Sequence, residues 1–201
     1  RASSQAVWRV LLAGAWSCLA LPAAAATVWH VPVDPGAATV GEALAAARPG
    51  DVVLVAPGVY AEHDLVLPDG VALRSETGLP DGATIDAGGL GRVLIVRDAG
   101  PGASVRGLTF TGGRAEGAAT DGLGGAVLCE RASPLFADCL FADNAAGRGG
   151  AVFCRDGASP EFRRCAFTGN EAATLGGAVA CHDGSSPAFL ECLFAGNAAG
   201  T

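Results

Sequence analysis

The last third of the chain alternates short apolar runs with turn residues, and it does so three times. The copies read GGAVLCERASPLFADCLFADNAAGR, GGAVFCRDGASPEFRRCAFTGNEAATL and GGAVACHDGSSPAFLECLFAGNAAGT, and they begin at Gly124, Gly149 and Gly176. Val127 and Cys129 are two residues apart, the spacing that places two side chains on one face of a strand. A unit of about 25 residues without room for a helix cannot close a core alone, so we predict that the copies stack as a solenoid.

Weaker copies extend this pattern upstream. Apolar runs at 52–55, 71–73 and 93–96 predict successive strands of one ladder, which continues in the clear repeats at Val127, Val152 and Val179. Residues typical of turns separate the runs. We therefore predict about six coils over 27–201, with the last coil truncated at the C-terminus.

The spacing inside one repeat also predicts a bend. Phe136 and Cys139 are three residues apart, so a continuous strand would place them on opposite faces, whereas a bend between them lets both point inward. Gly–Gly pairs and the three asparagines are expected to supply corners, because these residues tolerate positive φ.

One segment departs from the strand pattern. Residues 39–47, TVGEALAAA, predict a helix in which Thr39 and Glu42 have capping-box spacing and Pro49 with Gly50 ends the segment. A helix before the first coil would cover the open end of a solenoid, so we expect a short N-terminal capping helix.

The N-terminus has the pattern of an export signal. Arg1 and Arg9 precede an uncharged stretch that reaches Ala26, and its apolar part is too short to span a bilayer. We predict a signal peptide over 1–26 and a secreted, extracellular or outer-cell-surface location. Contact with a membrane is expected only through this peptide or through a C-terminal anchor beyond the fragment.

Charge and composition exclude two classes. All 13 basic residues are arginines, they are scattered among 20 acidic residues, and the formal net charge is −7. A phosphate-binding surface needs a basic excess, so nucleic acid and other polyanions are not expected as partners. A mean hydropathy of +0.38 with only 16% charged residues excludes a disordered chain.

Aligned positions should stack as ladders along the solenoid axis. We interpret the asparagines as a structural ladder, with sugar binding as the rival reading, and the phenylalanines of the repeats as core stacks rather than an exposed sugar platform. Two cysteine columns are read as buried thiols or as partly disulfide-bonded, and their spacing does not favour zinc. The ladder residues are Asn144, Asn170 and Asn197; Cys129, Cys154 and Cys181; and Cys139, Cys165 and Cys192.

Candidate ligand-binding residues are few. Asp156 and Asp183 stack as like charges and could hold Ca²⁺ weakly, although they could equally form a solvated pair beside Arg131. Asp138, Arg164 and Glu191 alternate in sign, as cross-rung ion pairing requires. No catalytic residue and no cofactor is assigned.

The longest departure from the repeat period is the segment 112–123, GGRAEGAATDGL. Insertions at one corner of a solenoid often carry binding functions, so Arg114, Glu116 and Asp121 form a candidate binding loop. A flexible Gly/Ala insertion is the alternative.

The segments PGDVVLVAPGVY, PDGVALRSE and VRGLTFTGG, followed by GGAV…PxFxxCxFxxN units, resemble secreted bacterial proteins of the pectate-lyase-like superfamily. The GGAV and FxxN elements are similar to polymorphic outer membrane protein repeats. The resemblance covers 26–201 and implies an all-β, right-handed, single-stranded parallel β-helix. It further implies a surface scaffold or adhesin-like protein that binds a polysaccharide or a surface protein without catalysis, or alternatively a polysaccharide lyase or glycoside hydrolase.

Overall fold

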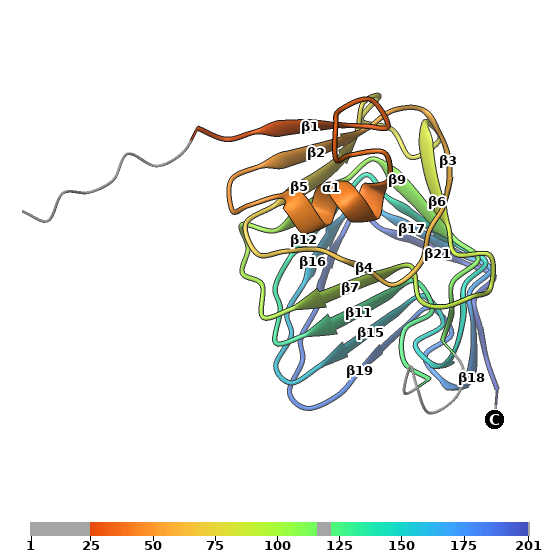
Figure 1. Ribbon diagram of the computed structural model, residues 1–201. Helices are drawn as coiled ribbons and strands as arrows, with labels where there is room; N and C mark the ends of the chain where they lie inside the picture. The colour runs from red at the N-terminus through yellow and green to blue at the C-terminus, as the bar shows by residue number, and fades with distance from the viewer. Residues whose placement is uncertain (1–24, 116–121, 201) are drawn as a thin grey trace, which may run out of the picture.

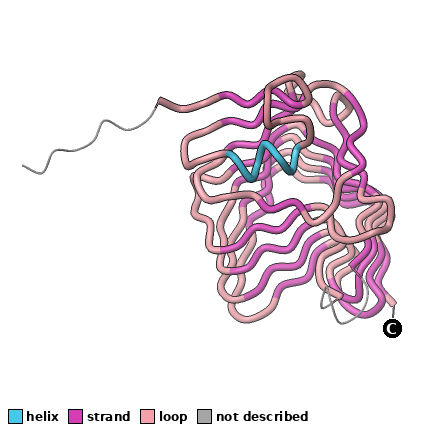
Figure 2. Tube along the Cα trace, in the orientation of Figure 1, coloured by secondary structure: helices cyan, strands magenta, loops and turns pink. Residues whose placement is uncertain are grey.

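The computed structural model describes residues 25–115 and 122–200 and shows an all-β parallel solenoid of about six turns with one helix (Figures 1 and 2). Successive turns lie on one another, so every sheet runs along the stack. The strand pairings are parallel and in register with the equivalent strand of the next turn, apart from one shift between Ala146 and Arg148. No helix in the described part of the chain is long and apolar enough to cross a membrane.

The strands form four sheets, which we name A to D. Sheet A contains β1 (Val28–Val31), β2 (Val52–Val55), β5 (Ala72–Ser75), β8 (Ser104–Arg106), β12 (Leu135–Ala137), β16 (Glu161–Arg163) and β20 (Ala188–Leu190). Sheet B contains β3 (Gly58–Ala61), β6 (Ala83–Asp86), β9 (Leu108–Thr111), β13 (Leu140–Ala142), β17 (Ala166–Thr168) and β21 (Leu193–Ala195). Sheet C contains β4 (Leu65–Val66), β7 (Leu94–Arg97), β11 (Val127–Glu130), β15 (Val152–Arg155) and β19 (Val179–Cys181). Sheet D contains β10 (Arg114–Ala115), β14 (Ala145–Arg148), β18 (Glu171–Leu175) and β22 (Ala198–Ala199).

The prediction of a single upstream ladder was wrong. The runs at 52–55 and 71–73 supply strands of sheet A, where Val52 pairs with Ala72. The run at 93–96 instead supplies β7 of sheet C, where Leu94 pairs with Val127. A complete repeat contains four strands, because the segment after each asparagine forms a strand of sheet D.

The predicted bend between β12 and β13 is confirmed, and its cause is a single left-handed residue. Asp138 has φ +54°, and its equivalents Arg164 and Glu191 have φ +50° and +55°. This conformation turns the chain so that Phe136 and Cys139 are both buried. A left-handed non-glycine residue is uncommon, and its recurrence at the same corner shows that the stack imposes it.

The asparagines do not supply the next corner themselves. The residue with positive φ is the one before each asparagine: Asp143 at +54°, Gly169 at +63° and Gly196 at +64°. The first glycine of each Gly–Gly pair does adopt positive φ, and a Cβ on the second, at Gly125, would overlap the Gly150 carbonyl oxygen of the next turn. Glycine is required there because two backbones meet.

The predicted helix is present as α1 (Val40–Ala46). Thr39 accepts a hydrogen bond from the backbone N–H of Glu42, and the Glu62 carboxylate accepts from the N–H groups of Val40 and Gly41. The helix packs against β1, β2 and β4 and buries a small apolar face that consists of Val40, Ala43 and Leu44.

Two columns of stacked phenylalanines fill the later turns. Ring centroids are 5.4, 4.8 and 4.7 Å apart along Phe110, Phe141, Phe167 and Phe194. The second column contains Phe136, Phe162 and Phe189, with centroids 5.0 and 5.1 Å apart. The predicted core stacks are thus present, and only Phe189 and Phe194 in the last turn are exposed.

The asparagines form a continuous hydrogen-bonded ladder beside these rings. The Asn144 backbone N–H and Nδ2 donate to Asn170 Oδ1 at 3.1 and 3.0 Å, and Asn170 donates in the same way to Asn197 at 3.0 and 2.8 Å. Nδ2 of Asn170 also donates to the Phe141 carbonyl at 2.9 Å. Because Asn144 and Asn170 are fully buried, the bonds between them satisfy polar groups that water cannot reach, whereas the bonds to the half-buried Asn197 are partly exposed.

We expect Asn170→Ala to lower the free energy of unfolding by about 3 kcal/mol, because it leaves the buried backbone N–H of Asn144 without its acceptor and the Phe141 carbonyl without the donor Nδ2 of Asn170. Asn197→Ala at the half-buried end of the ladder should cost only about 1 kcal/mol. Urea denaturation of the two variants and the wild type measures this difference. Equal losses for both variants would show that the ladder does not stabilise the interior turns.

Candidate functional site

The two cysteine columns lie where the repeat predicts them. Cys129, Cys154 and Cys181 pair directly across β11, β15 and β19. The described cysteines are free thiols, and four of them are buried whereas Cys181 is exposed and Cys192 is half-buried. The Cys129 thiol raises the pKa of Cys154, the Cys154 thiol raises the pKa of Cys181, and burial adds to both shifts, so both thiols stay protonated at neutral pH and neither is an activated nucleophile.

The two candidate calcium ligands each contact a basic side chain. Asp156 lies 3.4 Å from Nη1 of Arg131, and Asp183 lies 2.8 Å from Nδ1 of His182. Within 25–115 and 122–200, no group of three or more His, Cys, Asp or Glu side chains is arranged to hold a metal ion. Asp156 therefore has an arginine partner that already neutralises it.

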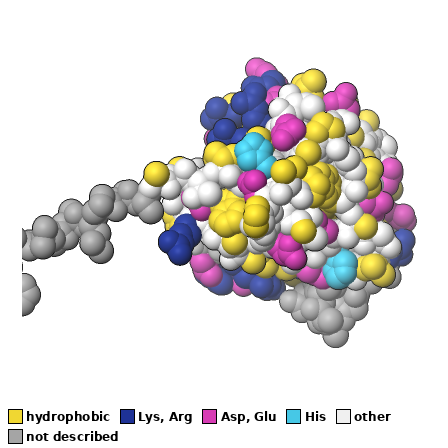
Figure 3. All heavy atoms as spheres, turned by 45° about the horizontal axis from the view of Figure 1, so that its top comes forward, with side chains coloured by type: hydrophobic (Ala, Val, Ile, Leu, Met, Phe, Trp, Pro, Cys, Tyr) yellow, Lys and Arg dark blue, Asp and Glu magenta, His cyan; other side chains and the backbone are white. Residues whose placement is uncertain are grey.

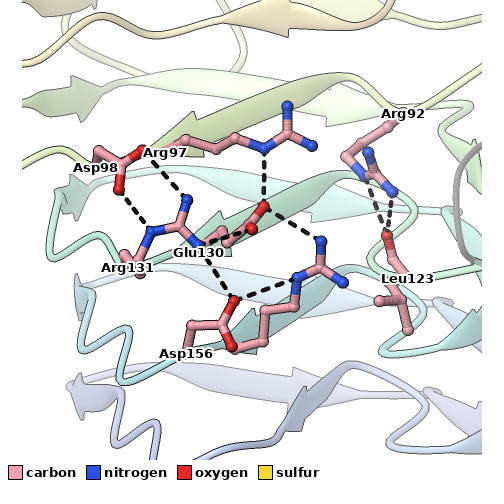
Figure 4. Close-up of polar contacts among 8 residues, drawn as sticks. Arg92, Arg97, Asp98, Leu123, Glu130, Arg131 and Asp156 are labelled. Carbon is pink, nitrogen blue, oxygen red and sulfur yellow. Dashed lines mark hydrogen bonds and ion pairs between the residues drawn. The ribbon is translucent and has the colours of Figure 1, made fainter.

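The candidate binding loop lies partly outside the described residues, which exclude Glu116 and Asp121. Arg114 begins β10, and its backbone N–H donates to the Gly91 carbonyl at 2.8 Å. At the other end of the loop, Arg92 donates from Nε and Nη2 to the Leu123 carbonyl at 3.0 and 2.6 Å (Figure 4). The buried Arg92 side chain thus fixes the point where the chain returns to the stack.

Sheet C carries a charge cluster on its outer face (Figure 4). Arg97, Glu130 and Arg155 pair in register on β7, β11 and β15, and the Glu130 carboxylate accepts from Arg97 at 2.8 Å and from Arg155 at 3.3 Å. Arg131 adds a contact of 3.0 Å and binds Asp98 on the preceding turn at 2.7 Å.

The charge of Glu130 in this cluster is already balanced by its arginine partners. Burial raises the pKa of the Glu130 carboxyl, but hydrogen bonds from Arg97, Arg131 and Arg155 outweigh it and lower this pKa from 4.5 to about 2. Glu130 consequently remains ionised at any pH near neutrality. Because its oxygens are engaged by three arginines, this cluster clamps neighbouring turns together and has little free capacity for a ligand.

The outer face of sheet A contains a different arrangement, which we name the arginine groove. Its volume is about 260 Å³, and its lining includes an aliphatic floor and four arginines from three strands and one corner. The lining residues are Arg74, Ser104, Val105, Arg106, Leu135, Ala137, Arg163 and Arg164. In Figure 3, acidic side chains are spread over the face drawn, whereas basic side chains gather in a few places.

The positive charge of the arginine groove is only partly neutralised. Asp138 lies 3.2 Å from Nε of Arg106 and accepts two hydrogen bonds from Arg164, at 2.7 and 2.9 Å. The hydrogen bonds from Arg164 lower the pKa of the Asp138 carboxyl, so this charge persists. Arg163 binds Glu161 within its own strand.

Sequence reasoning found only one residue of this groove. The repeat alignment singled out Arg164 with Asp138 and Glu191, because these three occupy one position of the clear repeats. Arg74 and Arg106 belong to irregular upstream turns, and only the observed pairing of β5 with β8 places them beside each other. The available signal was the alternation of inward and outward residues along each strand, in which Arg74 and Arg106 follow the inward residues Leu73 and Val105.

A scan against protein-family models finds none that matches this chain, and searches of curated proteins and of solved structures likewise find no match. Function is therefore inferred from the geometry of the described residues.

We expect the stability of the protein to fall as pH drops from about 4.5 towards 2, because protonation of Glu130 removes the clamp on sheet C. The folded-state pKa lies below the ordinary value, so the contribution is complete above pH 4.5 and lost below it, at up to about 1.4 kcal/mol per pH unit. Glu130→Gln should flatten this part of the profile. Urea unfolding at several pH values measures it.

The control is Asp81→Asn, which removes an exposed carboxylate outside the cluster. Its acid profile should follow that of the wild type. A Glu130→Gln profile as steep as the wild-type profile would contradict the assignment of the acid sensitivity to Glu130.

Proposed function

We propose that this chain is a secreted or cell-surface solenoid scaffold that presents its outer faces to a glycan or a surface protein and performs no catalysis in this portion. The observation that carries the proposal is the stacking of outward side chains into columns along the sheets, such as Arg74, Arg106, Ala137 and Arg163 on sheet A. A long, rigid stack with repeated outer faces is suited to multivalent contact rather than to one concentrated reaction centre.

Features of the chain support this proposal. The repeat pattern resembles that of polymorphic outer membrane proteins and of the pectate-lyase-like superfamily, and the N-terminal segment 1–26 has the pattern of an export signal. On this basis we infer a right-handed solenoid whose first turn is capped by α1, since that helix buries Val40 and Leu44 against the first strands.

A combined binding and turnover screen tests the proposed function. The chain is presented to immobilised neutral, carboxylated and sulfated polysaccharides with and without Ca²⁺, and released reducing ends and unsaturated products are measured in parallel. We expect retention on at least one polysaccharide without release of any product. Turnover would overturn the proposal in favour of a lyase or hydrolase, and retention on none of them would overturn the glycan-binding part.

A further inference from the structure

The arginine groove is built on a column in which like charges face each other. On the outer face of sheet A, Arg74 of β5 pairs with Arg106 of β8, which pairs with Ala137 of β12, which pairs with Arg163 of β16. Neighbouring positions of such a column are about 4.8 Å apart. Like charges placed directly opposite each other destabilise a sheet, so a favourable counter-charge is needed there.

The acidic neighbours do not supply all of that counter-charge. Four arginines line the groove, whereas only Asp138 and Glu161 are paired with them. Among the residues that the structure describes, Arg74 has no ion-pair partner. Glu191 also attracts Arg164, so the four arginines face three acidic side chains and a net positive charge remains, in a chain whose net charge is −7.

The small side chain of Ala137 makes room between these charges. It occupies the column position between Arg106 and Arg163, and all three residues line the groove together with the apolar side chains of Val105 and Leu135. Ser104, on the same lining, adds a hydroxyl group. A ligand seated over Ala137 would contact arginines of three different turns.

We propose that the arginine groove binds a tetrahedral oxyanion, a sulfate or phosphate monoester carried on a glycan. Asp138 illustrates why a carboxylate fits less well, since Arg164 engages both of its oxygens and Arg106 shares one of them, which leaves no oxygen for a third arginine. A monoester has three free oxygens, so it can accept from one guanidinium and still bridge to the next. Arginine suits this role because its planar fork matches such oxyanions and is weakly hydrated.

The acidic residues around the groove further restrict the class of ligand that it can bind. A densely charged polyanion that ran beyond the groove would meet the carboxylates that dominate the rest of the chain. An isolated or sparsely spaced ester group meets only the local positive charge. The groove therefore selects sparsely esterified glycans over nucleic acids and highly charged polymers.

Isothermal titration calorimetry of the chain at constant ionic strength tests this inference. The probes are sodium sulfate, inorganic phosphate, glucose 6-sulfate and glucose 6-phosphate, with sodium acetate as the carboxylate. We expect at least one sulfate or phosphate ester to bind at least tenfold more tightly than acetate, and comparison of the two esters identifies the preferred oxyanion. Arg74→Gln and Arg163→Gln should each weaken binding at least fivefold.

Arg48→Gln is the matched control, because it removes the same charge at a position outside the groove, beside Asp51. Its affinity should equal that of the wild type. No ester binding, equal affinity for acetate, an unchanged affinity in Arg74→Gln, or the same loss in Arg48→Gln would overturn the inference.

This inference rests on the proposed glycan-binding role, and the two can fail separately. Polysaccharide retention that persists in Arg74→Gln would keep the scaffold function and reject the groove as its site. Ester binding with concurrent release of sugar products would keep the groove and reject a non-catalytic scaffold.

Discussion

Parallel, in-register stacking is the constraint on which the rest of this structure depends. Each residue of one turn lies about 4.8 Å from its equivalent in the next, so every position must be compatible with a copy of itself. Phenylalanine meets this condition because flat rings stack, as Phe136 on Phe162 does with centroids 5.0 Å apart. Asparagine meets it because one side chain both donates and accepts, as Asn170 does between Asn144 and Asn197. Inward positions are therefore restricted to a few residue types, and this restriction produces the visible repeat.

The same constraint acts differently on charges. A charged residue cannot stack favourably on its own kind, so an outward column must alternate in sign, be interrupted or bind a counter-ion. Arg97, Glu130 and Arg155 alternate, and the result is a column of ion pairs at 2.8 and 3.3 Å. Arg74 and Arg106 do not alternate. Charges therefore alternate on the outer face of sheet C but not on that of sheet A, where Arg74 has no ion-pair partner among the described residues.

The sequence predicted this structure well where the repeat is regular and poorly where it is not. From Gly124 onward, the spacing predicts the inward Asn, Cys and Phe columns, because an identical period brings identical residues together. Upstream of Gly124, turns differ in length, and the alignment wrongly placed residues 93–96 in the same ladder as 52–55. The register of β5 on β8 depends on how the intervening corners close, which is a property of backbone contacts rather than of local pattern. For the same reason the alignment found Arg164 but not the Arg74–Arg106 pair.

Two different parts of the outer surface consequently stabilise the stack and bind a ligand: the Glu130 cluster on sheet C and the arginine groove on sheet A. Glu130 is held by three arginines, so an added ligand would have to displace ion pairs that already clamp adjacent turns. In the arginine groove, an anion that binds Arg74 would relieve its repulsion with Arg106, while Asp138 stays paired with Arg164 and Arg106. The free energy of binding there includes the removal of an unfavourable term that the unliganded stack retains. The interior of this solenoid requires the same residue types in every turn, whereas its outer face does not. An outward column in which positive and negative charges do not alternate can therefore form a binding site.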